Sequence, residues 1–256
     1  MNPTVRRAEI VDIIRRQGRV TVDNLAKTLA ISRETIRRDL SELARKGKVH
    51  KFHGGASLPM ITEEGPFQHR MGENVAAKVQ IAAEAIKLIS QGETLLIDTG
   101  STTLYFAEKL AEMQNLTVVT NSAEIARVIS LGSLHSRTFL LGGEFNGDNR
   151  QTVGSLAISQ LKTFRAHHAV LTIGALDSRT GVMDFCIEEA QIARTMIQQA
   201  ESVTLLADSS KFSRIASFEV CGLDRVTNLV CDQPPSGIIK EALIEAGVTI
   251  ISVGPQ

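Results

Sequence analysis

The stretch "LLIDTGSTTLYFAEKL", residues 95–110, decides the fold of the larger part of this chain. Its apolar beginning predicts a buried strand that ends at Asp98, and its second half has the apolar spacing of an amphipathic helix. A short turn of Gly, Ser and Thr joins the two. Because the first turn of a helix has free N–H groups and a partial positive charge, this arrangement is typical of a loop that holds a phosphate.

Strand-like apolar runs and helical patterns alternate through the rest of the chain. Strands rich in Val, Leu and Ile that alternate with helices predict an α/β fold, with a largely parallel sheet covered on both faces. The expected strands are Leu95–Asp98, Leu116–Thr120, Thr138–Leu141, Ala169–Gly174, Val203–Ala207, Val226–Cys231 and Val248–Ser252. The expected helices lie around residues 76–91, 103–113, 122–131, 154–162, 187–200 and 236–246.

Small and polar residues follow several of these strands. In parallel sheets ligands bind beyond the carboxyl ends of the strands, so these residues are expected to surround one ligand. Gly100 would let the backbone approach an anion, and Lys211 would supply a positive charge. Asp98 would accept bonds from sugar hydroxyls. Ordinary loops are the alternative, because Gly, Ser and Asn are common in turns. The segments are 98–103, 120–122, 142–143, 174 and 208–211.

Several classes of protein are disfavoured by what the sequence lacks. No Walker A lysine follows the turn and no GxGxxG occurs there, which disfavours nucleotide binding. Cys186, Cys221 and Cys231 have no metal-ligand spacing and are an odd number, so reduced thiols are expected, with no metal and no cofactor. No apolar run approaches the roughly 20 residues of a membrane span, and the beginning, "MNPTVRRAEI", lacks the apolar region of a signal peptide. A cytoplasmic protein is expected.

The net charge of zero conceals a division of the chain. Residues 1–57 hold 13 Lys and Arg against 6 Asp and Glu, whereas residues 58–256 hold 15 against 22. A basic N-terminal part on an acidic remainder indicates two modules, of which the first meets a polyanion. The segment 58–74 has Pro, Gly and no clear period and is interpreted as a linker, which gives domains at 1–57 and 75–256.

The basic part has the pattern of a winged helix-turn-helix. Helices are expected over 5–17, where Gly18 ends the helix, within 20–29, and over 33–46, where Ser32 is the N-cap and Gly47 the end. A hairpin is expected over 48–57. In the third helix an apolar stripe formed by Ile36, Leu40 and Leu43 faces inward, so Arg33, Glu34, Arg37, Arg38 and Ser41 face outward.

A third helix of this kind lies in the major groove, where arginines bond guanine edges or phosphates, and the wing contacts the DNA backbone. The alternative is a small helical domain with a solvated basic face. The residues expected to contact double-stranded DNA are Ser32, Arg33, Glu34, Thr35, Arg37, Arg38, Ser41, Lys48, Lys51 and His53, with His50 beside them in the wing.

The motifs "ISRETIRRDLSEL" and "KVHKFHGGA" resemble the signature of the DeoR family of bacterial transcriptional regulators. The shared positions are Ser32, Thr35–Leu40 and His53–Ala56. "DTGSTT", "VVTNS", "LLGGE" and "ADSSKF" resemble the effector domain of that family, which is similar in fold to ribose-5-phosphate isomerase. "PFQHR" and "MDFCIEEA" resemble the family's regulators of glycerol-3-phosphate use.

The resemblance implies a bound phosphorylated sugar or related metabolite. "FCIEEAQIARTMI" implies that Glu188 or Glu189 lies near the site. The effector-binding residues that it implies are Asp98, Gly100, Ser101, Thr102, Thr103, Thr120, Asn121, Gly142, Gly143, Glu188 and Lys211.

Two functions fit these features. One is a repressor of a carbohydrate operon that a phosphorylated sugar relieves; an activator would share every feature. The other is a sugar-phosphate isomerase with a basic appendage, for which Asp98, Asp208, Glu188 or Glu189 could move the proton. No catalytic motif is visible, and His167 and His168 are expected to be structural. The attached DNA-binding part favours a sensor that is not an enzyme. One such part contacts few base pairs, so a homodimer or homotetramer is expected.

Overall fold

The apolar runs of the second part of the chain form one parallel sheet. This computed structural model describes residues 2–45, 48–57, 64–132 and 135–254. Its seven-stranded sheet has the order β15-β14-β12-β9-β4-β5-β6, and every pairing in it is parallel. The predicted α/β class is therefore confirmed. The strands are β4 (Thr94–Ile97), β5 (Thr117–Thr120), β6 (Arg137–Leu140), β9 (Ala166–Leu171), β12 (Ala200–Ala207), β14 (Asn228–Cys231) and β15 (Thr249–Ser252).

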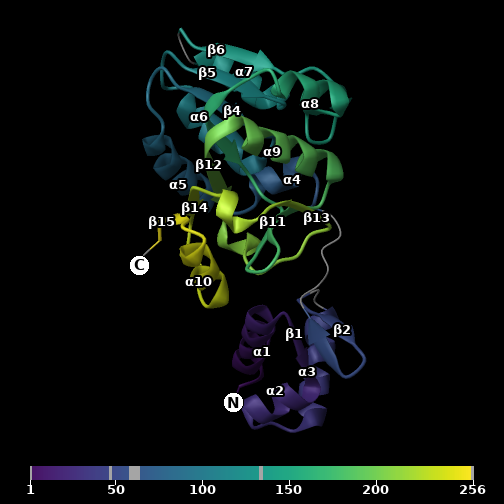
Figure 1. The fold of residues 1–256 in the computed structure, drawn as a ribbon. Coiled ribbons are helices and arrows are strands. Elements are labelled where there is room, and N and C mark those ends of the chain that lie inside the picture. The colour runs from purple at the N-terminus through teal and green to yellow at the C-terminus, as the bar shows by residue number, and fades with distance from the viewer. Residues whose placement is uncertain (1, 46–47, 58–63, 133–134, 255–256) are drawn as a thin grey trace. The chain divides into compact units, whose positions relative to one another are not determined.

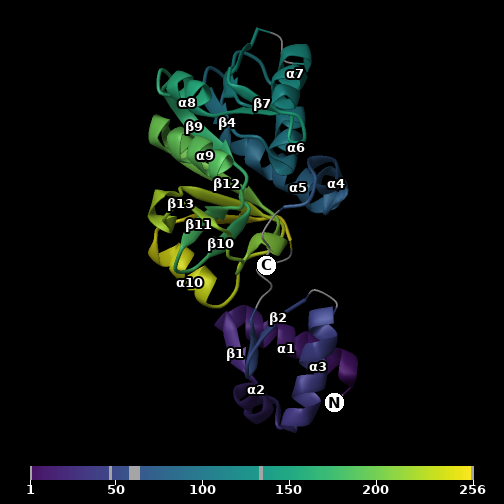
Figure 2. The ribbon, with the colours of Figure 1, turned by 90° about the vertical axis from the view of Figure 1, so that its right-hand side faces the viewer.

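Helices cover both faces of this sheet because its strands are apolar on both sides. Leu95 and Ile97 pack into the core on one face, and Leu96 packs into the core on the other. Figure 2 shows the sheet between α5, α6 and α7 on one side and α8, α9 and α10 on the other. These helices are α5 (Val75–Ala85), α6 (Ser101–Leu110), α7 (Ala123–Gly132), α8 (Ser155–Leu161), α9 (Ile187–Gln199) and α10 (Ile238–Glu245).

Several short elements were not expected from the sequence, because three or four residues are too few to show a period. A hairpin of β7 (Glu144–Asn146) and β8 (Gln151–Val153) follows β6. A second sheet has the order β10-β11-β13, formed by Ala175–Asp177, Gly181–Asp184 and Phe218–Cys221. The 3-10 helices are η1 (Ile86–Leu88), η2 (Ser209–Lys211) and η3 (Leu223–Arg225).

The segment interpreted as a linker over 58–74 is partly folded. Residues 58–63 lie outside the described part. Phe67–Gly72 form helix α4, in which Phe67 is 2% exposed and belongs to the core beside α5 and α6. The hydroxyl of Tyr105 on α6 donates to the carbonyl of Met71 at 3.1 Å. This half of the segment is therefore part of the larger unit, and a single turn and a half of helix was too short to recognise.

The chain divides into two compact units, Met1–Ile61 and Thr62–Gln256 (Figure 1). In the first unit, which we call the head, helices surround a core of Ile10, Ile14, Leu25, Ile36 and Leu40. Its small sheet has the order β1-β3-β2, and β1 was not expected. Gly47, the predicted end of the third helix, lies outside the described residues. The elements are α1 (Pro3–Gln17), β1 (Arg19–Thr21), α2 (Val22–Leu29), α3 (Arg33–Arg45), β2 (His50–Phe52) and β3 (Gly55–Ser57).

A buried ion pair joins α1 to α3 in the head. Asp39 is 1% exposed, and its two carboxylate oxygens accept from Arg6 Nε at 2.5 Å and Arg7 Nε at 2.8 Å. Burial by itself would raise the pKa of Asp39, but the bonds from the two arginines outweigh it and lower the pKa. Asp39 therefore belongs to the scaffold of the head and not to its surface.

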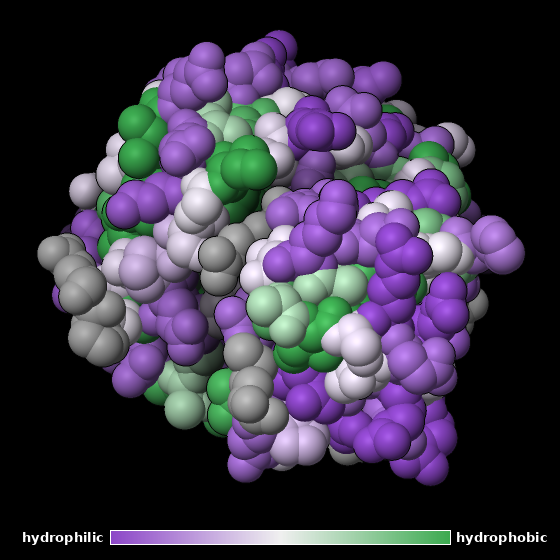
Figure 3. Space-filling model, turned by 90° about the horizontal axis from the view of Figure 1, so that it is seen from below, coloured by the Kyte–Doolittle hydropathy of each residue, from purple (hydrophilic) through white to green (hydrophobic). Residues whose placement is uncertain are grey.

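The exterior is largely hydrophilic where Figure 3 views it, and hydrophobic residues are visible there in small, separate areas. Among the described residues, no helix is long and apolar enough to cross a membrane.

Candidate functional site

The third helix of the head presents a polar face. Ile36, Leu40 and Leu43 are buried, as predicted from their spacing. The Ser32 hydroxyl accepts from the Thr35 N–H at 3.3 Å and bonds the Thr35 hydroxyl at 2.9 Å, which confirms Ser32 as the cap of α3. The side chains predicted to face outward are exposed: Arg33, Glu34, Arg37, Arg38 and Ser41.

The exposed cations of the head differ in how they are paired. Arg33 binds Asp23 at 2.8 Å, and Arg37 lies 3.9 Å from Glu34. Both pairs are well exposed, so each adds little stability and opens readily. Arg38 and Lys48 make no ion pair with any residue that the structure describes. The α3 face therefore has guanidinium groups available for an external anion.

The wing contacts the same helix. Lys51 Nζ donates to the Ser41 hydroxyl at 2.8 Å, which joins β2 to α3. The guanidinium of Arg19 lies 3.9 Å from the centroid of the Phe52 ring, a contact that the sequence did not indicate. His50 and His53 are exposed. Helix α3 and the wing thus form one continuous basic surface on the head.

In the larger unit, the strand order of the sheet reverses between β4 and β9. The strands β5 and β6 follow β4 toward one edge of the sheet, and β9 and the later strands extend toward the other edge. The crevice at such a point is where ligands bind in open α/β sheets. Asp98 ends β4 there, and its carboxylate accepts the Thr172 N–H at 2.9 and 3.1 Å. Burial, together with the nearby charges of Asp184 and Glu189, raises the pKa of Asp98 well above its usual range. Asp98 is therefore held at the crevice in a state that resists ionisation.

The turn after β4 is closely packed. A side chain at Gly100 would collide with that of Thr172, so the backbone approach at Gly100 is to β9 and not to an open space. The Thr103 hydroxyl donates to the carbonyls of Asp98 and Gly100, at 3.0 and 3.2 Å. No side chain among the described residues caps the N-terminus of α6, and the hydroxyls of Ser101 and Thr102 make no hydrogen bond within the described part. Those two hydroxyls and the N–H groups beside them are the open donors of this turn.

The residues after β5 bind one another. The Thr120 hydroxyl accepts from the Ser122 N–H at 3.0 Å, and the Asn121 amide donates to Gln151 at 3.2 Å and to the Thr152 carbonyl at 3.1 Å. Thr120 and Asn121 are 0% and 1% exposed. In this structure the Asn121 amide holds strand β8 of the hairpin against the sheet.

None of the eleven effector-binding residues implied by the resemblance is among those that line the cavity described below, and Gly142, Gly143 and Glu188 make their contacts elsewhere. Gly142 donates its N–H to Gln160 at 2.9 Å, and Gly143 has φ 153° and sits against the Val153 carbonyl, where a side chain would collide. Glu188 is exposed and accepts from the Cys186 thiol at 3.0 Å. Its neighbour on α9, Glu189, lines the cavity instead, because successive helical residues point in different directions.

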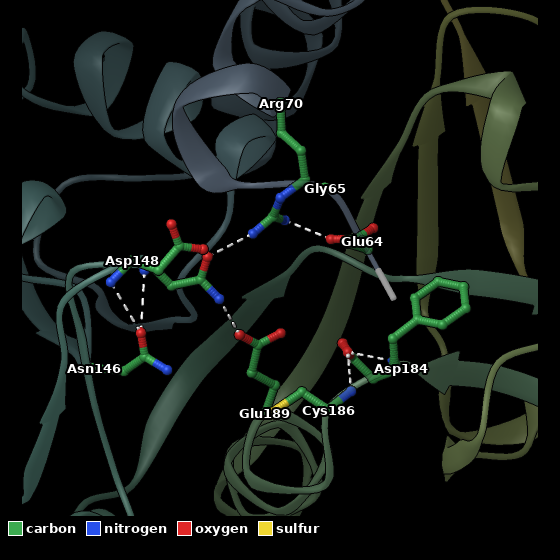
Figure 4. Close-up of a pocket in the computed structure, with 10 residues that line it drawn as sticks. Glu64, Gly65, Arg70, Asn146, Asp148, Asp184, Cys186 and Glu189 are labelled. Carbon is green, nitrogen blue, oxygen red and sulfur yellow. Dashed lines mark hydrogen bonds and ion pairs between the residues drawn. The ribbon is translucent and has the colours of Figure 1, made fainter. Parts of the chain in front are cut away.

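A cavity of about 210 Å³ lies in the larger unit, and two of its lining residues, Asp184 and Glu189, are those whose charges act on Asp98. Figure 4 shows Arg70 entering it from α4, with Glu189 and Asp184 on the opposite wall. Seven of its ten lining residues are polar or charged, which suits a ligand with several hydroxyl groups. The lining residues are Glu64, Gly65, Arg70, Asn146, Asp148, Asn149, Asp184, Phe185, Cys186 and Glu189.

The positive charges at this cavity are bound to the protein's own oxygen atoms. Arg70 donates from its two terminal nitrogens to Glu64 at 2.5 Å and to Asn149 at 2.8 Å. Lys211, at the end of η2, binds the other oxygen of Glu64. Lys78 on α5 is 3% exposed and donates to the Arg70 carbonyl; burial lowers its pKa. The cations are therefore in place for an anion, and Glu64 is the anion that they now hold.

The negative charges of the cavity oppose one another. Burial raises the pKa of Asp184 to about 7, and the charges of Glu189 and Glu64 add to this rise. Burial likewise raises the pKa of Glu189, although the amides of Gln151 and Asn149 both donate to its carboxylate, at 2.5 and 2.6 Å. Carboxyl groups of this kind can both donate to and accept from sugar hydroxyls near neutral pH.

The sequence interpretation did not identify Glu64, Arg70 or Lys78 as site residues. Two signals were present: Arg70 closes the motif "PFQHR", and Asp184 lies in "MDFCIEEA". The segment that contains Glu64 and Arg70 was assigned to a linker, and only the fold of α4 brings it to the sheet edge. The described residues contain no group of His, Cys, Asp and Glu arranged to hold a metal ion.

Residues 6–62 match the family described as "DeoR-like helix-turn-helix domain", and residues 73–233 match "DeoR C terminal sensor domain". The chain belongs to the DeoR family. The glycerol-3-phosphate regulon repressor of Escherichia coli (strain K12) is 30% identical over 245 residues, 96% of this chain and 97% of that one. The transcriptional repressor AccR of Agrobacterium fabrum is 33% identical over 239 residues, 92% of each chain.

Solved structures with some likeness include ribose 5-phosphate isomerase A of Methanocaldococcus jannaschii, with a TM-score of 0.40, 17% identity and coverage of 55% of each chain. The full-length sorbitol operon regulator SorC of Klebsiella pneumoniae has a TM-score of 0.37 and 14% identity, over 94% of this chain and 98% of that one. Likenesses of this size say nothing about what this DeoR-family chain binds.

Proposed function

We propose that this DeoR-family chain is a DNA-binding repressor of an operon for carbohydrate use, relieved by a phosphorylated sugar. One observation carries the proposal: a head with exposed arginines on α3 belongs to the same chain as a polar cavity whose cations already bind an anion. Similar proteins of Escherichia coli (strain K12) and Haemophilus influenzae are named glycerol-3-phosphate regulon repressors, and one of Escherichia coli O157:H7 is named "Putative aga operon transcriptional repressor".

The head would bind double-stranded operator DNA through α3 and the wing. Arg37 and Arg38 are the candidates for base edges in the major groove, and Lys48 and Lys51 are the candidates for phosphates. Ser32 and Thr35 serve the cap of α3, so contacts from them would come through their remaining hydrogen-bonding capacity. A protein that binds DNA and a phosphorylated metabolite acts in the cytoplasm, which is the location that we propose.

The effector would bind at the carboxyl edge of the sheet. Its phosphate is proposed to bind Arg70 and Lys211, with the open donors of Ser101 and Thr102 at the start of α6 beside it. Its hydroxyl groups are proposed to bind Asp184 and Glu189. Gly100, Thr103, Thr120, Asn121 and Gly143 would contribute by shaping this edge, since their polar groups or close contacts are used within the protein.

The experiment is an operator titration with candidate effectors. The full chain selects an operator from random DNA, and its affinity is then measured with glycerol 3-phosphate, glucose 6-phosphate and fructose 6-phosphate, each beside its unphosphorylated counterpart. Allosteric coupling of about 1–3 kcal/mol predicts a loss of operator affinity of roughly 5–150-fold with the right phosphorylated compound. No change with any phosphorylated compound would contradict the proposal.

We also propose a homodimer or homotetramer. One head would contact too few base pairs to select a genomic site. Strand β6 is an open edge of the sheet, and large apolar side chains are exposed on it and on the elements near it in Figure 1: Leu131, Leu140, Phe145 and Leu156. Light scattering of the full chain is expected to give a dimer or a tetramer, and the double variant Leu140→Ser, Phe145→Ser is expected to shift it toward monomer. A wild-type chain that is monomeric at micromolar concentration would contradict this.

A sugar-phosphate isomerase is the second candidate, because a carboxyl group with a pKa of about 7, such as Asp184, suits proton transfer. Its Oδ1 atom, however, accepts from the N–H groups of Phe185 and Cys186, at 2.6 and 3.2 Å. His167 and His168 are bound to Thr94 and Glu93 at the opposite ends of the strands. We infer that the chain is not an enzyme; turnover of ribose 5-phosphate by wild-type protein, lost in Asp184→Asn, would contradict this.

A further inference from the structure

Glu64 is placed where a bound anion would be. Its two carboxylate oxygens are divided between two cations from distant parts of the chain, Arg70 on α4 and Lys211 at the end of η2. The three side chains are only 14–19% exposed, so this is a built and largely desolvated anion position and not a solvated surface pair. In addition, Arg70 Nε is buried and has no hydrogen-bond partner among the described residues.

The two cations that hold Glu64 could also hold an anion of higher charge than a carboxylate. Arg70 and Lys211 together carry two positive charges, and Glu64 supplies one negative charge. A phosphate monoester carries about −1.5 to −2 charges near pH 7 and has three acceptor oxygens. It could therefore accept from both cations and still have an acceptor oxygen left, which a carboxylate with two oxygens does not. Lys78, which donates to the Arg70 carbonyl, holds the backbone of Arg70 in place.

Glu64 also lies at a decisive point of the chain. The matched helix-turn-helix family ends at residue 62, and the matched sensor family begins at residue 73. Glu64 is thus between the two matched parts, and its bonds to Arg70 and Lys211 tie this connection to the carboxyl edge of the sheet. A ligand that removes these bonds changes how the connection to the head is held.

We propose that Glu64 is an internal competitor of the effector: its carboxylate occupies the phosphate position on Arg70 and Lys211, and its displacement by the effector's phosphate lowers operator affinity. The proposal rests on the proposed function and adds how the cavity is regulated. If Glu64 occupies the position about 90–99% of the time, its removal raises the affinity for phosphate about 10–100-fold, because the competent fraction of the protein increases by that factor.

The test compares the full-length Glu64→Gln variant with wild type, with inorganic phosphate as the probe. Glu108→Gln, at an exposed position of α6, is the matched control. Calorimetric titration is expected to give tighter phosphate binding in E64Q by a factor of about ten or more, unchanged binding in E108Q, and no binding in Lys211→Met. Operator affinity without effector is expected to fall in E64Q by roughly 5–150-fold. A variant that were merely damaged would not bind phosphate more tightly.

A second measurement uses wild type, so it does not depend on the folding of the variant. Hydrogen exchange of the peptide that contains Glu64 and Gly65 is expected to accelerate when inorganic phosphate is added, because Glu64 is released. Unchanged exchange at saturating phosphate, or equal phosphate affinity in wild type and a folded E64Q, would overturn the competition.

The two proposals fail in different ways. If a phosphorylated sugar lowers the operator affinity of wild type but E64Q binds phosphate no more tightly, the repressor function stands and the competition is overturned. If E64Q binds phosphate more tightly but no phosphorylated sugar changes operator binding by wild type, the competition for the anion position is supported and the regulatory function is overturned.

Discussion

The head and the sensor unit treat their positive charges in opposite ways. On α3 and the wing, Arg37, Arg38 and Lys48 are exposed and at most weakly paired. In the sensor unit, Arg70, Lys78 and Lys211 are turned inward and bound to the protein's own oxygen atoms. The head therefore has cations available for a polyanion, whereas under our proposal the sensor site binds a phosphate in exchange for the carboxylate that it already holds. This difference fits a regulator that binds DNA without a ligand and loses operator affinity when the effector binds.

The largest expected effect concerns the buried ion pair of the head. Asp39→Ala removes the carboxylate that Arg6 and Arg7 share between α1 and α3. Removing one partner of a buried ion pair costs about 3–5 kcal/mol. The head is therefore expected to unfold at a much lower temperature than the sensor unit, and operator binding is expected to be lost. Thermal unfolding followed by circular dichroism measures this. Asp23→Ala, which breaks the exposed pair with Arg33, is the control and should change stability by less than about 1 kcal/mol.

The next effect tests whether the exposed arginines read DNA. Arg37→Ala and Arg38→Ala are each expected to weaken operator binding by about 1–3 kcal/mol, and to relax the sequence preference, if a bidentate contact to a base is lost. Gel-shift titrations on the selected operator and on single-base variants measure both. Arg45→Ala, near the end of the same helix and paired with Glu42, is the control. Affinity that stays at the wild-type value in both variants would show that another surface reads the DNA.

A smaller and less selective effect is expected from the wing. Lys48→Ala is expected to weaken binding to all DNA sequences alike and to reduce the slope of log affinity against log salt by about 1, because one phosphate contact is lost. Lys51→Ala should have a weaker effect, since Lys51 also serves to bind Ser41. The measurement is the salt dependence of binding to operator and to random DNA. A loss confined to the operator would place these lysines at base edges instead.

The smallest effect concerns the stability of the sensor unit and how it depends on pH. The pKa of Asp184 is about 7 in the folded chain because the group is buried and near other carboxyl groups. The value in an unfolded chain is about 3.9. The folded state therefore holds the extra proton between these values, so the stability of the sensor unit falls as pH rises through this window and stays low above it.

Asp184→Asn removes this dependence. The variant is expected to melt at a higher temperature than wild type at pH 8, where the native carboxyl is ionised, and to approach wild type near pH 5. Each kcal/mol corresponds to about 2–4 °C in a unit of this size. Thermal unfolding between pH 5 and pH 8 is the measurement, with Asp148→Asn at an exposed position of the same cavity as the control. A difference between variant and wild type that is independent of pH would contradict the assignment.

The sequence was most informative where a physical constraint acts on a whole element. The strands of the parallel sheet are apolar on both faces, as Leu95, Leu96 and Ile97 illustrate, and each was predicted to within a few residues. The outward face of α3 followed from the inward positions of Ile36, Leu40 and Leu43. The short strands β7, β8, β10, β11 and β13 could not be predicted, because elements of three or four residues show no period.

The candidate effector site was predicted less completely than the fold. The polar residues after the strands predicted a site at the carboxyl edge of the sheet, but none of the residues implied as effector-binding lines the cavity. Lys211 reaches it through Glu64, and the charges of Asp184 and Glu189 act on Asp98. Gly100 and Thr103 have a role in packing that no sequence pattern separates from ligand binding. Arg70 and Glu64 reach the site only because α4 packs against the sensor unit, where Arg70 and Lys211 both bind Glu64. Glu64 and Lys211 are far apart in the chain, and a single sequence does not indicate which distant residues meet.

Under the proposed function, an effector phosphate bound at Arg70 and Lys211 in the sensor unit lowers the affinity of the head for operator DNA. The most direct test is the operator affinity of the full chain with and without the phosphorylated sugar found by titration, in wild type and in Lys211→Ala, with circular dichroism to confirm folding. Wild type is expected to lose roughly 5–150-fold in affinity on adding the sugar phosphate, and Lys211→Ala to bind the operator equally with and without it. An equal loss of affinity in wild type and in folded Lys211→Ala would contradict the claim.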